Sequence, residues 1–259
     1  MNWRTFRKLV HHEWKLKGSR RRLDRSHTHR YGRLLYFALL ALAGIGVATY
    51  FAINGQLELH QLWGVAIGFP YMLVVMGVLM LRREWENGTF GWWLTLPYSR
   101  LSLIGAKFFA AWLRTVAVSC VVYVVISLFA GILTLLVGGY SAEDVWVTML
   151  AGLPLLGIVI GFSPIILSLS LLLATFHYTT LRVFSPILWI GIIGGLSTFY
   201  NGFQTFLPSY HMAQRFFSAQ PGPLIPHLGA VLIGMVISWV IAYLFIRIAA
   251  YLLERKLSI

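Results

Sequence analysis

The chain has 259 residues, of which 58% are hydrophobic and 11% are charged, and its formal net charge is +13. Soluble domains carry about a quarter charged residues and a little under half apolar ones, so this composition excludes most soluble classes. The high apolar content also excludes a disordered chain. Several apolar runs approach the roughly 20 residues that cross a hydrocarbon core of about 30 Å. The chain is therefore predicted to be an all-α integral membrane protein.

Residues 1–33 are predicted to form an amphipathic helix and a basic connector on the cytoplasmic side. Trp3, Phe6, Val10 and Trp14 fall within a narrow arc of a helical wheel, and the basic residues lie mostly outside that arc. A basic amphipathic helix with tryptophans on its apolar face lies in the membrane interface rather than crossing it. The alternative is a solvated helix that caps a soluble domain, and the sequence offers no such domain. The connector is expected to contact anionic lipid headgroups.

Six apolar segments follow, and each is predicted to be a membrane-spanning helix. They are Leu34–Ile53, Leu62–Leu81, Phe108–Val137, Val147–Leu173, Val183–Tyr200 and Leu228–Leu252. Pro154 and Pro164 mark expected kinks in the fourth span, because proline lacks the N–H that a helix interior needs. Together the spans make one transmembrane domain over residues 34–252, and a short tail follows over residues 253–259.

The positive charges lie almost entirely on one side of this arrangement. Eighteen Lys and Arg residues precede the first span or fall in the loop over residues 82–107, the loop after the fourth span and the tail. The opposite loops contain only Arg215. Because loops rich in Lys and Arg stay in the cytoplasm, both termini are predicted to be cytoplasmic. This distribution explains the basic net charge as a topology signal, and no nucleic-acid-binding module accompanies it.

The sequence lacks the patterns of several other functions. All eight acidic residues lie outside the predicted spans, whereas coupled secondary transporters usually place ionisable groups near the midplane. The histidines form no metal-binding motif, the single cysteine, Cys120, lies in an apolar run, and no nucleophile elbow is present. None of the five lysines follows a glycine, so the phosphate-binding loop GxxxxGK[ST] is absent. Metal binding, catalysis and nucleotide binding by this chain are therefore not expected.

The loop between the second and third predicted spans is the most informative segment. It holds two glutamates, a glycine break, an aromatic run and a proline, namely Glu84, Glu86, Gly88, Thr89, Phe90, Trp92, Trp93 and Pro97. Ser99 is a suitable N-cap for the helix of the third span. We expect an extension of the second span, a sharp turn, a short aromatic helix across the membrane face, and re-entry. Alternatively, Trp92 and Trp93 only anchor the loop at the interface.

This loop resembles a known family. The segments Glu84, Glu86-Asn87-Gly88-Thr89, Leu94-Thr95-Leu96-Pro97, Ser99-Arg100 and Lys107 are similar to the pattern E-x-E-x-G-T … L-T-x-P-x-S-R … K of ABC-2 type transporter permeases. The outline of an N-terminal interfacial helix and six spans resembles the same family. The resemblance implies the transmembrane subunit of an ATP-binding cassette exporter with the type V fold, in the cytoplasmic (inner) membrane of a prokaryote.

The resemblance also implies how the parts work. The eight loop residues named above would form a coupling helix that docks on a separate ATPase subunit, and that subunit would hold ATP and Mg²⁺. The external segment over residues 201–227 would form re-entrant helices at an outer gate. A second permease, identical or related, would complete the transporter. Because the spans hold no acid, the expected cargo is hydrophobic or amphipathic, such as a peptide, an antibiotic or a lipid-linked molecule. A secondary transporter, a channel, and a membrane-embedded enzyme or sensor scaffold remain the alternatives.

Overall fold

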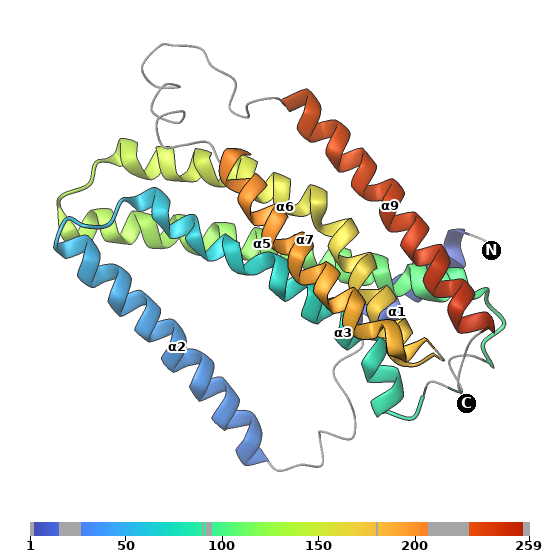
Figure 1. Ribbon diagram of the computed structural model, residues 1–259. Helices are drawn as coiled ribbons and strands as arrows, with labels where there is room; N and C mark the ends of the chain where they lie inside the picture. The colour runs from blue at the N-terminus through green and yellow to red at the C-terminus, as the bar shows by residue number, and fades with distance from the viewer. Residues whose placement is uncertain are drawn as a thin grey trace.

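The computed structural model describes residues 3–15, 27–89, 91, 95–179, 181–206 and 228–255. These residues form helices joined by turns, and no β-strand is found among them. In chain order the helices are α1 (Trp3–Lys15), α2 (His27–Ile53), the 3-10 helix η2 (Leu59–Gly68), α3 (Phe69–Glu86), α5 (Arg100–Val137), α6 (Ala142–His177), the short 3-10 helix η3 (Arg182–Phe184), α7 (Ser185–Phe206) and α9 (Leu228–Arg255). Figure 1 shows α3, α5 and α6 running side by side, whereas α2 meets them only near its C-terminal end.

Four helical segments of the described chain are long and apolar enough to cross a membrane. They are Leu59–Glu86, which joins η2 to α3, then α5, α6 and α9. Two shorter apolar helices, Leu42–Ile53 and Arg182–Ser197, coincide with the first and fifth predicted spans. The all-helical membrane architecture is therefore as predicted, and the count of six spans stays a prediction. The external segment was predicted over residues 201–227, and its residues 207–227, with all four of its prolines, lie outside the described part of the chain.

Helix α5 is longer than the span predicted from its apolar content. It begins at Arg100 rather than at Phe108, and the hydroxyl of Ser99 accepts a hydrogen bond from the backbone N–H of Ser102, which confirms Ser99 as the N-cap. The helix ends at Gly138, whose positive φ of 64° suits glycine. Its 38 residues correspond to about 57 Å at a rise of about 1.5 Å per residue. Hydropathy detects only the continuously apolar part of the helix, so the first turns, which contain Arg100 and Lys107, were assigned to a loop.

The segment before α3 is held against α6 by one tryptophan. The Nε1–H group of Trp63 in η2 donates a hydrogen bond of 2.8 Å to the backbone carbonyl of Thr148. The indole ring occupies the space beside Gly152, where a β-carbon would overlap it. At the junction of η2 and α3, Pro70 lies in the first helical turn, where its missing N–H costs nothing. The second span therefore starts as a 3-10 helix and continues as an α-helix.

Helix α6 continues through both of its internal prolines. Pro164 cannot donate to the carbonyl of Ile160, and the hydroxyl of Ser163 donates to that carbonyl instead, at 2.7 Å. The hydroxyl of Ser238 in α9 accepts a hydrogen bond of 3.3 Å from the backbone N–H of Ile165. Side-chain hydroxyls thus satisfy the backbone where proline interrupts the helix, as lipid-embedded helices require.

Helices α6 and α9 pack through two reciprocal notches. Met235 of α9 fills the space beside Gly161 of α6, and Phe162 of α6 fills the space beside Gly234 of α9. A β-carbon at Gly234 would lie 2.9 Å from Cζ of Phe162. Small residues of this kind let two helix backbones approach closely where lipid provides no hydrophobic driving force.

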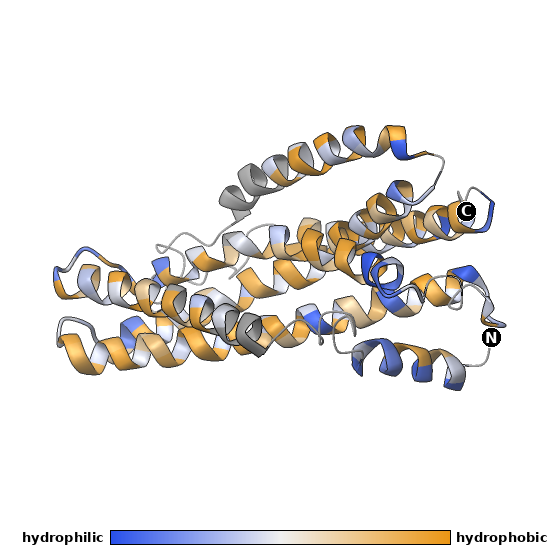
Figure 2. Cartoon of the chain, turned by 90° about the horizontal axis from the view of Figure 1, so that it is seen from below, coloured by the Kyte–Doolittle hydropathy of each residue, from blue (hydrophilic) through white to orange (hydrophobic). Residues whose placement is uncertain are grey.

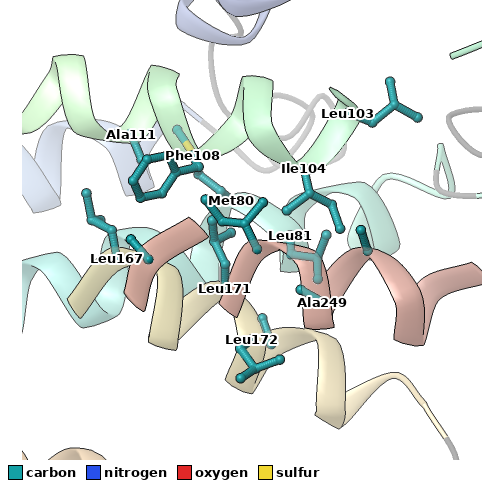
Figure 3. Packing of buried hydrophobic residues seen from close by; sticks show 14 of the residues in the cluster. Met80, Leu81, Leu103, Ile104, Phe108, Ala111, Leu167, Leu171, Leu172 and Ala249 are labelled. Atoms are coloured by element: carbon teal, nitrogen blue, oxygen red, sulfur yellow. The ribbon is translucent and has the colours of Figure 1, made fainter. Parts of the chain in front are cut away.

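The largest buried cluster joins α3, α5, α6 and α9 near one end of the bundle (Figure 3). Figure 3 labels Met80 and Leu81 of α3, Leu103, Ile104, Phe108 and Ala111 of α5, Leu167, Leu171 and Leu172 of α6, and Ala249 of α9. Leu9 and Val10 of α1 pack against the same cluster. The apolar core therefore lies beside the charged residues at the beginning of α5.

Candidate functional site

Lys107 is a buried cation at the meeting point of three helices. Its side chain, in the N-terminal part of α5, is only 1% exposed. The Nζ atom lies 2.8 Å from Oε1 of Glu13 in α1 and 2.7 Å from Oε1 of Glu84 near the end of α3. Both glutamate side chains are 12% exposed. We call Glu13, Glu84, Thr89, Lys107 and Arg114 the Lys107 junction.

The charges of this junction depend on one another. A buried ion is tolerated only when short, charge-assisted hydrogen bonds replace its hydration. Lys107 supplies those bonds to two carboxylates, and the carboxylates supply them to Lys107. Removing the ammonium group would leave two buried anions facing each other. The junction therefore connects α1, α3 and α5, and its stability depends on keeping both carboxylates within hydrogen-bonding distance of the ammonium group.

The start of the predicted coupling loop folds back on Glu84. The hydroxyl of Thr89 donates a hydrogen bond of 2.6 Å to Oε2 of Glu84, and its backbone N–H donates to the Glu84 carbonyl at 3.0 Å. Gly88 between them has a positive φ of 67°, a conformation that glycine adopts without strain. The predicted break at Gly88 is thus confirmed, and the turn holds the second oxygen of the Glu84 carboxylate.

Glu86 has a different environment from Glu84. Its Oε1 atom lies 2.8 Å from Nε of Arg82 one helical turn earlier, and the Arg82 side chain is more than half exposed. Such surface pairs contribute little to stability. In the structure Glu86 pairs with Arg82, whereas Glu84 pairs with Lys107.

Arg114 attaches the end of α1 to α5. Its guanidinium donates hydrogen bonds of 2.7 Å and 2.8 Å to the backbone carbonyls of Glu13 and Trp14. These carbonyls belong to the last turn of α1, where helical partners are missing, and a cation there also complements the helix dipole. The guanidinium lies 6.0 Å from the centre of the Trp14 ring. Arg114 thus caps a helix whose last turn lies 101 positions away in the chain.

The predicted stripe of α1 divides between two environments. Phe6 makes an edge-to-face contact with Phe109 of α5, with 5.7 Å between ring centres, and Val10 packs against the core cluster. Trp14 lies at the rim of the interface beside Arg114, whereas Trp3 is 72% exposed. Part of the stripe therefore binds the bundle, and Trp3 stays available to another surface.

A second aromatic contact joins the end of α3 to the turn after α6. The indole of Trp85 stacks on the ring of Tyr178 with 4.4 Å between the ring centres and an angle of 13° between the planes. This pair was not predicted, because Trp85 occupies an unspecified position of the family pattern and Tyr178 lies in no recognisable motif. It links the two connections on this side of the bundle, the one after α3 and the one after α6.

The remaining predicted site residues lie in the connection between α3 and α5. Phe90, Trp92 and Trp93 are outside the described residues. Pro97 is exposed in the turn before α5, and its neighbours Leu96 and Tyr98 pack against the core cluster. This connection is shorter than the predicted loop over residues 82–107, because α3 continues to Glu86 and α5 begins at Arg100. Both ends of the connection are therefore fixed to helices.

Residues 30–197 match the family described as ABC-2 family transporter protein. The chain belongs to the ABC-2 transporter family. The matched range includes Glu84, Thr89, Lys107 and Arg114, and it begins after α1. The resemblance inferred from residues 84–107 is thus confirmed, and membership of the ABC-2 family implies, in general, association with an ATP-binding subunit. No curated protein and no solved structure matches the chain.

Proposed function

We propose that this chain is the transmembrane permease subunit of an ATP-binding cassette exporter. Membership of the ABC-2 family supports a transporter, and the absence of a phosphate-binding loop from the sequence supports hydrolysis of ATP on a separate subunit. That subunit would bind ATP and Mg²⁺, and a second permease, identical or related, would complete the pathway. The cargo is a hydrophobic or amphipathic molecule, such as a peptide, an antibiotic or a lipid-linked compound, because the predicted spans hold no acidic residue.

The proposed topology has six spans with both termini in the cytoplasm, in the inner membrane of a prokaryote. The distribution of eighteen Lys and Arg residues on one side against one on the other supports this orientation. The shorter apolar helices within α2 and before Ser197 supply the two spans beyond the four long ones. In this orientation α1, the Lys107 junction and the turn at Gly88 all lie on the cytoplasmic side.

The observation that carries the mechanism is the ion pair between Glu84 and Lys107. Glu84 precedes the coupling connection and Lys107 follows it, so their 2.7 Å contact closes the connection into a hairpin with a fixed base. A push on this hairpin by the closing ATPase would move α3 and α5 together. Glu13 would carry α1 along with them. Conformational switches of this kind act by rigid-body movement rather than by local bending.

Aromatic residues within the connection suit the role of a docking surface. Phe90, Trp92 and Trp93 provide large, rigid apolar side chains, the kind that dominate binding energy at interfaces. Glu86 is partly exposed, and its ion-pair partner among the described residues is the surface residue Arg82, so it is available for a basic group of the ATPase. We propose that the ATPase docks on these residues and that the Lys107 junction transmits the movement of the ATPase to the helices.

Co-purification and reconstitution test the proposed function. The chain is expressed with an ATPase encoded beside it, and the complex is reconstituted in vesicles. Trp92→Ala combined with Trp93→Ala should weaken docking. Lys107→Met combined with Glu13→Gln and Glu84→Gln, which removes the ion pairs without leaving unpaired carboxylates, should leave the ATPase bound but hydrolysing ATP without cargo movement. Arg82→Gln, which removes a surface pair, is the matched control and should behave like the wild type. Cargo transport on an ion gradient by the chain alone would reject the proposal in favour of a secondary transporter.

A further inference from the structure

Helix α1 presents three distinct faces around its axis. Phe6, Leu9, Val10 and Glu13 point towards the bundle, where they contact α5 and the core cluster. At 100° per residue, the opposite side carries the exposed cations Arg4, Arg7, Lys8 and Lys15 together with the exposed His11 and His12. Trp3 and Trp14 lie near opposite ends of α1, both on the edge between these two sides. We call the side with the cations the outer face of α1.

The outer face is purely basic. The one acidic residue of α1, Glu13, points away from it and is held by Lys107. Figure 2 shows α1 as a hydrophilic helix lying beside a mostly hydrophobic bundle. A helix whose cations face one way and whose tryptophans lie at the adjacent edge is suited to an anionic, amphipathic surface, because indole rings prefer the level of lipid headgroups.

The length of α5 places α1 at the level of the headgroups. About 20 residues of a helix cross the hydrocarbon, so a span that ends at Val137 leaves the N-terminal part of α5, up to about residue 117, at or beyond the inner edge. The contacts of α1 lie within that part, at Gly105, Lys107, Phe109 and Arg114. The tryptophan edge can therefore turn towards the lipid while the outer face meets the headgroups around the bundle.

We propose that the outer face of α1 binds anionic phospholipid headgroups of the inner leaflet, and that this binding regulates coupling through Glu13. The inference rests on the proposed function, because it places the lipid contact at the far end of the path that transmits the ATPase movement. A headgroup that attracts the outer face holds α1 in its position at the membrane. Glu13 then stays against Lys107, and the base of the coupling hairpin stays closed.

A lipid surface fits the outer face better than a protein partner does. The exposed ring of Trp3 adjoins the basic surface, and indole rings prefer the level of lipid headgroups. The attraction of a polybasic segment to anionic lipid amounts to about 1 kcal/mol for each Lys or Arg near the surface, or about fivefold in affinity. The cations of the outer face therefore suffice for a clear selection of lipid.

The first experiment measures lipid selection directly. The full chain is reconstituted in phosphatidylcholine vesicles, and its association with spin-labelled phosphatidylglycerol is compared with that of spin-labelled phosphatidylcholine. The wild type should prefer phosphatidylglycerol at low ionic strength and lose the preference at high salt. Replacing Arg7, Lys8 and Lys15 with Gln should reduce the preference by up to about fivefold for each charge removed. The charge-preserving set Arg7→Lys, Lys8→Arg and Lys15→Arg should retain it, as should Arg255→Gln in α9.

The second experiment measures regulation in the assembled complex. Cargo movement per ATP hydrolysed should rise with the phosphatidylglycerol content of the vesicles, and the triple Gln variant should lose this response. Glu13→Gln should keep the lipid preference but lose the response, because it breaks the link to Lys107. Equal association with both lipids, or an unchanged preference in the triple Gln variant, would overturn the proposal.

Two outcomes separate this proposal from the proposed function. If the triple Gln variant releases the ATPase in detergent without added lipid, the outer face binds the ATPase and the lipid proposal is wrong. If phosphatidylglycerol is selected but no ATPase assembles with the chain, the proposed function fails while the lipid-binding face stands.

Discussion

The ammonium group of Lys107 lies 2.8 Å from a carboxylate oxygen of Glu13, although the two residues are 94 positions apart in the chain. This contact makes α1 part of the charge balance of the bundle rather than a separate membrane anchor. Because Lys107 also binds Glu84, a substitution at any of these three residues changes the electrostatic environment of the other two.

Lys107→Met should destabilise the protein strongly. Breaking a buried pair by removing one partner costs about 3–5 kcal/mol, because the opposite charge is left uncompensated. Thermal unfolding of the purified protein in detergent would show a lower midpoint, while Arg82→Gln should cost less than about 1 kcal/mol. Adding Glu13→Gln and Glu84→Gln to Lys107→Met removes both stranded anions and should recover much of the loss. A triple variant less stable than Lys107→Met alone would contradict this account.

Gly152→Ala should disrupt the packing of the second span. The added methyl group would overlap the rigid indole of Trp63 and displace its hydrogen bond to Thr148. Overpacking of this kind costs about 1–3 kcal/mol, and tryptophan fluorescence during unfolding would detect it. Gly157→Ala in the same helix is the control, since nothing lies within 4 Å of its added carbon. That control should be neutral or slightly stabilising, because alanine favours a helix over glycine.

Phe6→Ala and Trp3→Ala should separate the two environments of α1. Phe6 packs against Phe109 of α5. Its loss should weaken the binding of α1 to α5 by about 1–2 kcal/mol, as expected for a half-buried aromatic ring. Trp3 is 72% exposed and should contribute much less to the stability of the protein in detergent. Limited proteolysis would report release of α1 as faster cleavage after its basic residues. Equal effects of the two changes would show that α1 does not dock through Phe6.

The stack of Trp85 on Tyr178 should be measurable as a coupling energy. A double-mutant cycle with Trp85→Ala and Tyr178→Ala should give about 0.5–1.5 kcal/mol, the range for aromatic pairs. Burial raises the pKa of the Tyr178 hydroxyl above its usual value, so the ring is uncharged at neutral pH. The coupling should therefore be constant below the ordinary tyrosine pKa of about 10 and should be lost as the pH rises further. A coupling energy of zero would mean that the stacking of the two rings does not contribute to stability.

The orientation of the chain is testable with cysteines at two described positions. In a Cys120→Ala background, Gly139→Cys lies in the turn between α5 and α6 and should react with an impermeant maleimide in intact cells. Lys8→Cys on the exposed side of α1 should react only after lysis. Labelling of residue 8 in intact cells would reverse the proposed topology.

Local features of the fold were predictable because their causes are local. The N-cap at Ser99 and the break at Gly88 follow from residue types that suit one backbone conformation, and the structure confirms both. The extent of α5 was underestimated, because the apolar run begins at Phe108 whereas the helix already begins at Arg100, after the N-cap Ser99. The 3-10 start of the second span depends on Trp63 reaching α6, and no pattern within the span reveals that contact.

The candidate site was predicted only in part, because its ion pairs cross long distances in sequence. Glu84 and Lys107 were recognised as parts of a family pattern, but their contact with each other was not. Glu13 is the one acid in a basic helix, and that isolation is the signal that could have marked it as a partner for a buried cation. Tyr178 and Trp85 carry no comparable signal, since aromatic residues are common near membrane surfaces.

The reciprocal notches between α6 and α9 restrict how this protein can change over evolutionary time. Gly161 accepts Met235 and Gly234 accepts Phe162, so each helix supplies one small residue and one large residue at adjacent positions. A larger residue at either glycine is acceptable only when the opposite side chain becomes smaller. Related sequences should therefore change at these positions in pairs, and chimeras that exchange α9 alone should lose helix packing unless the matching pair in α6 is exchanged as well.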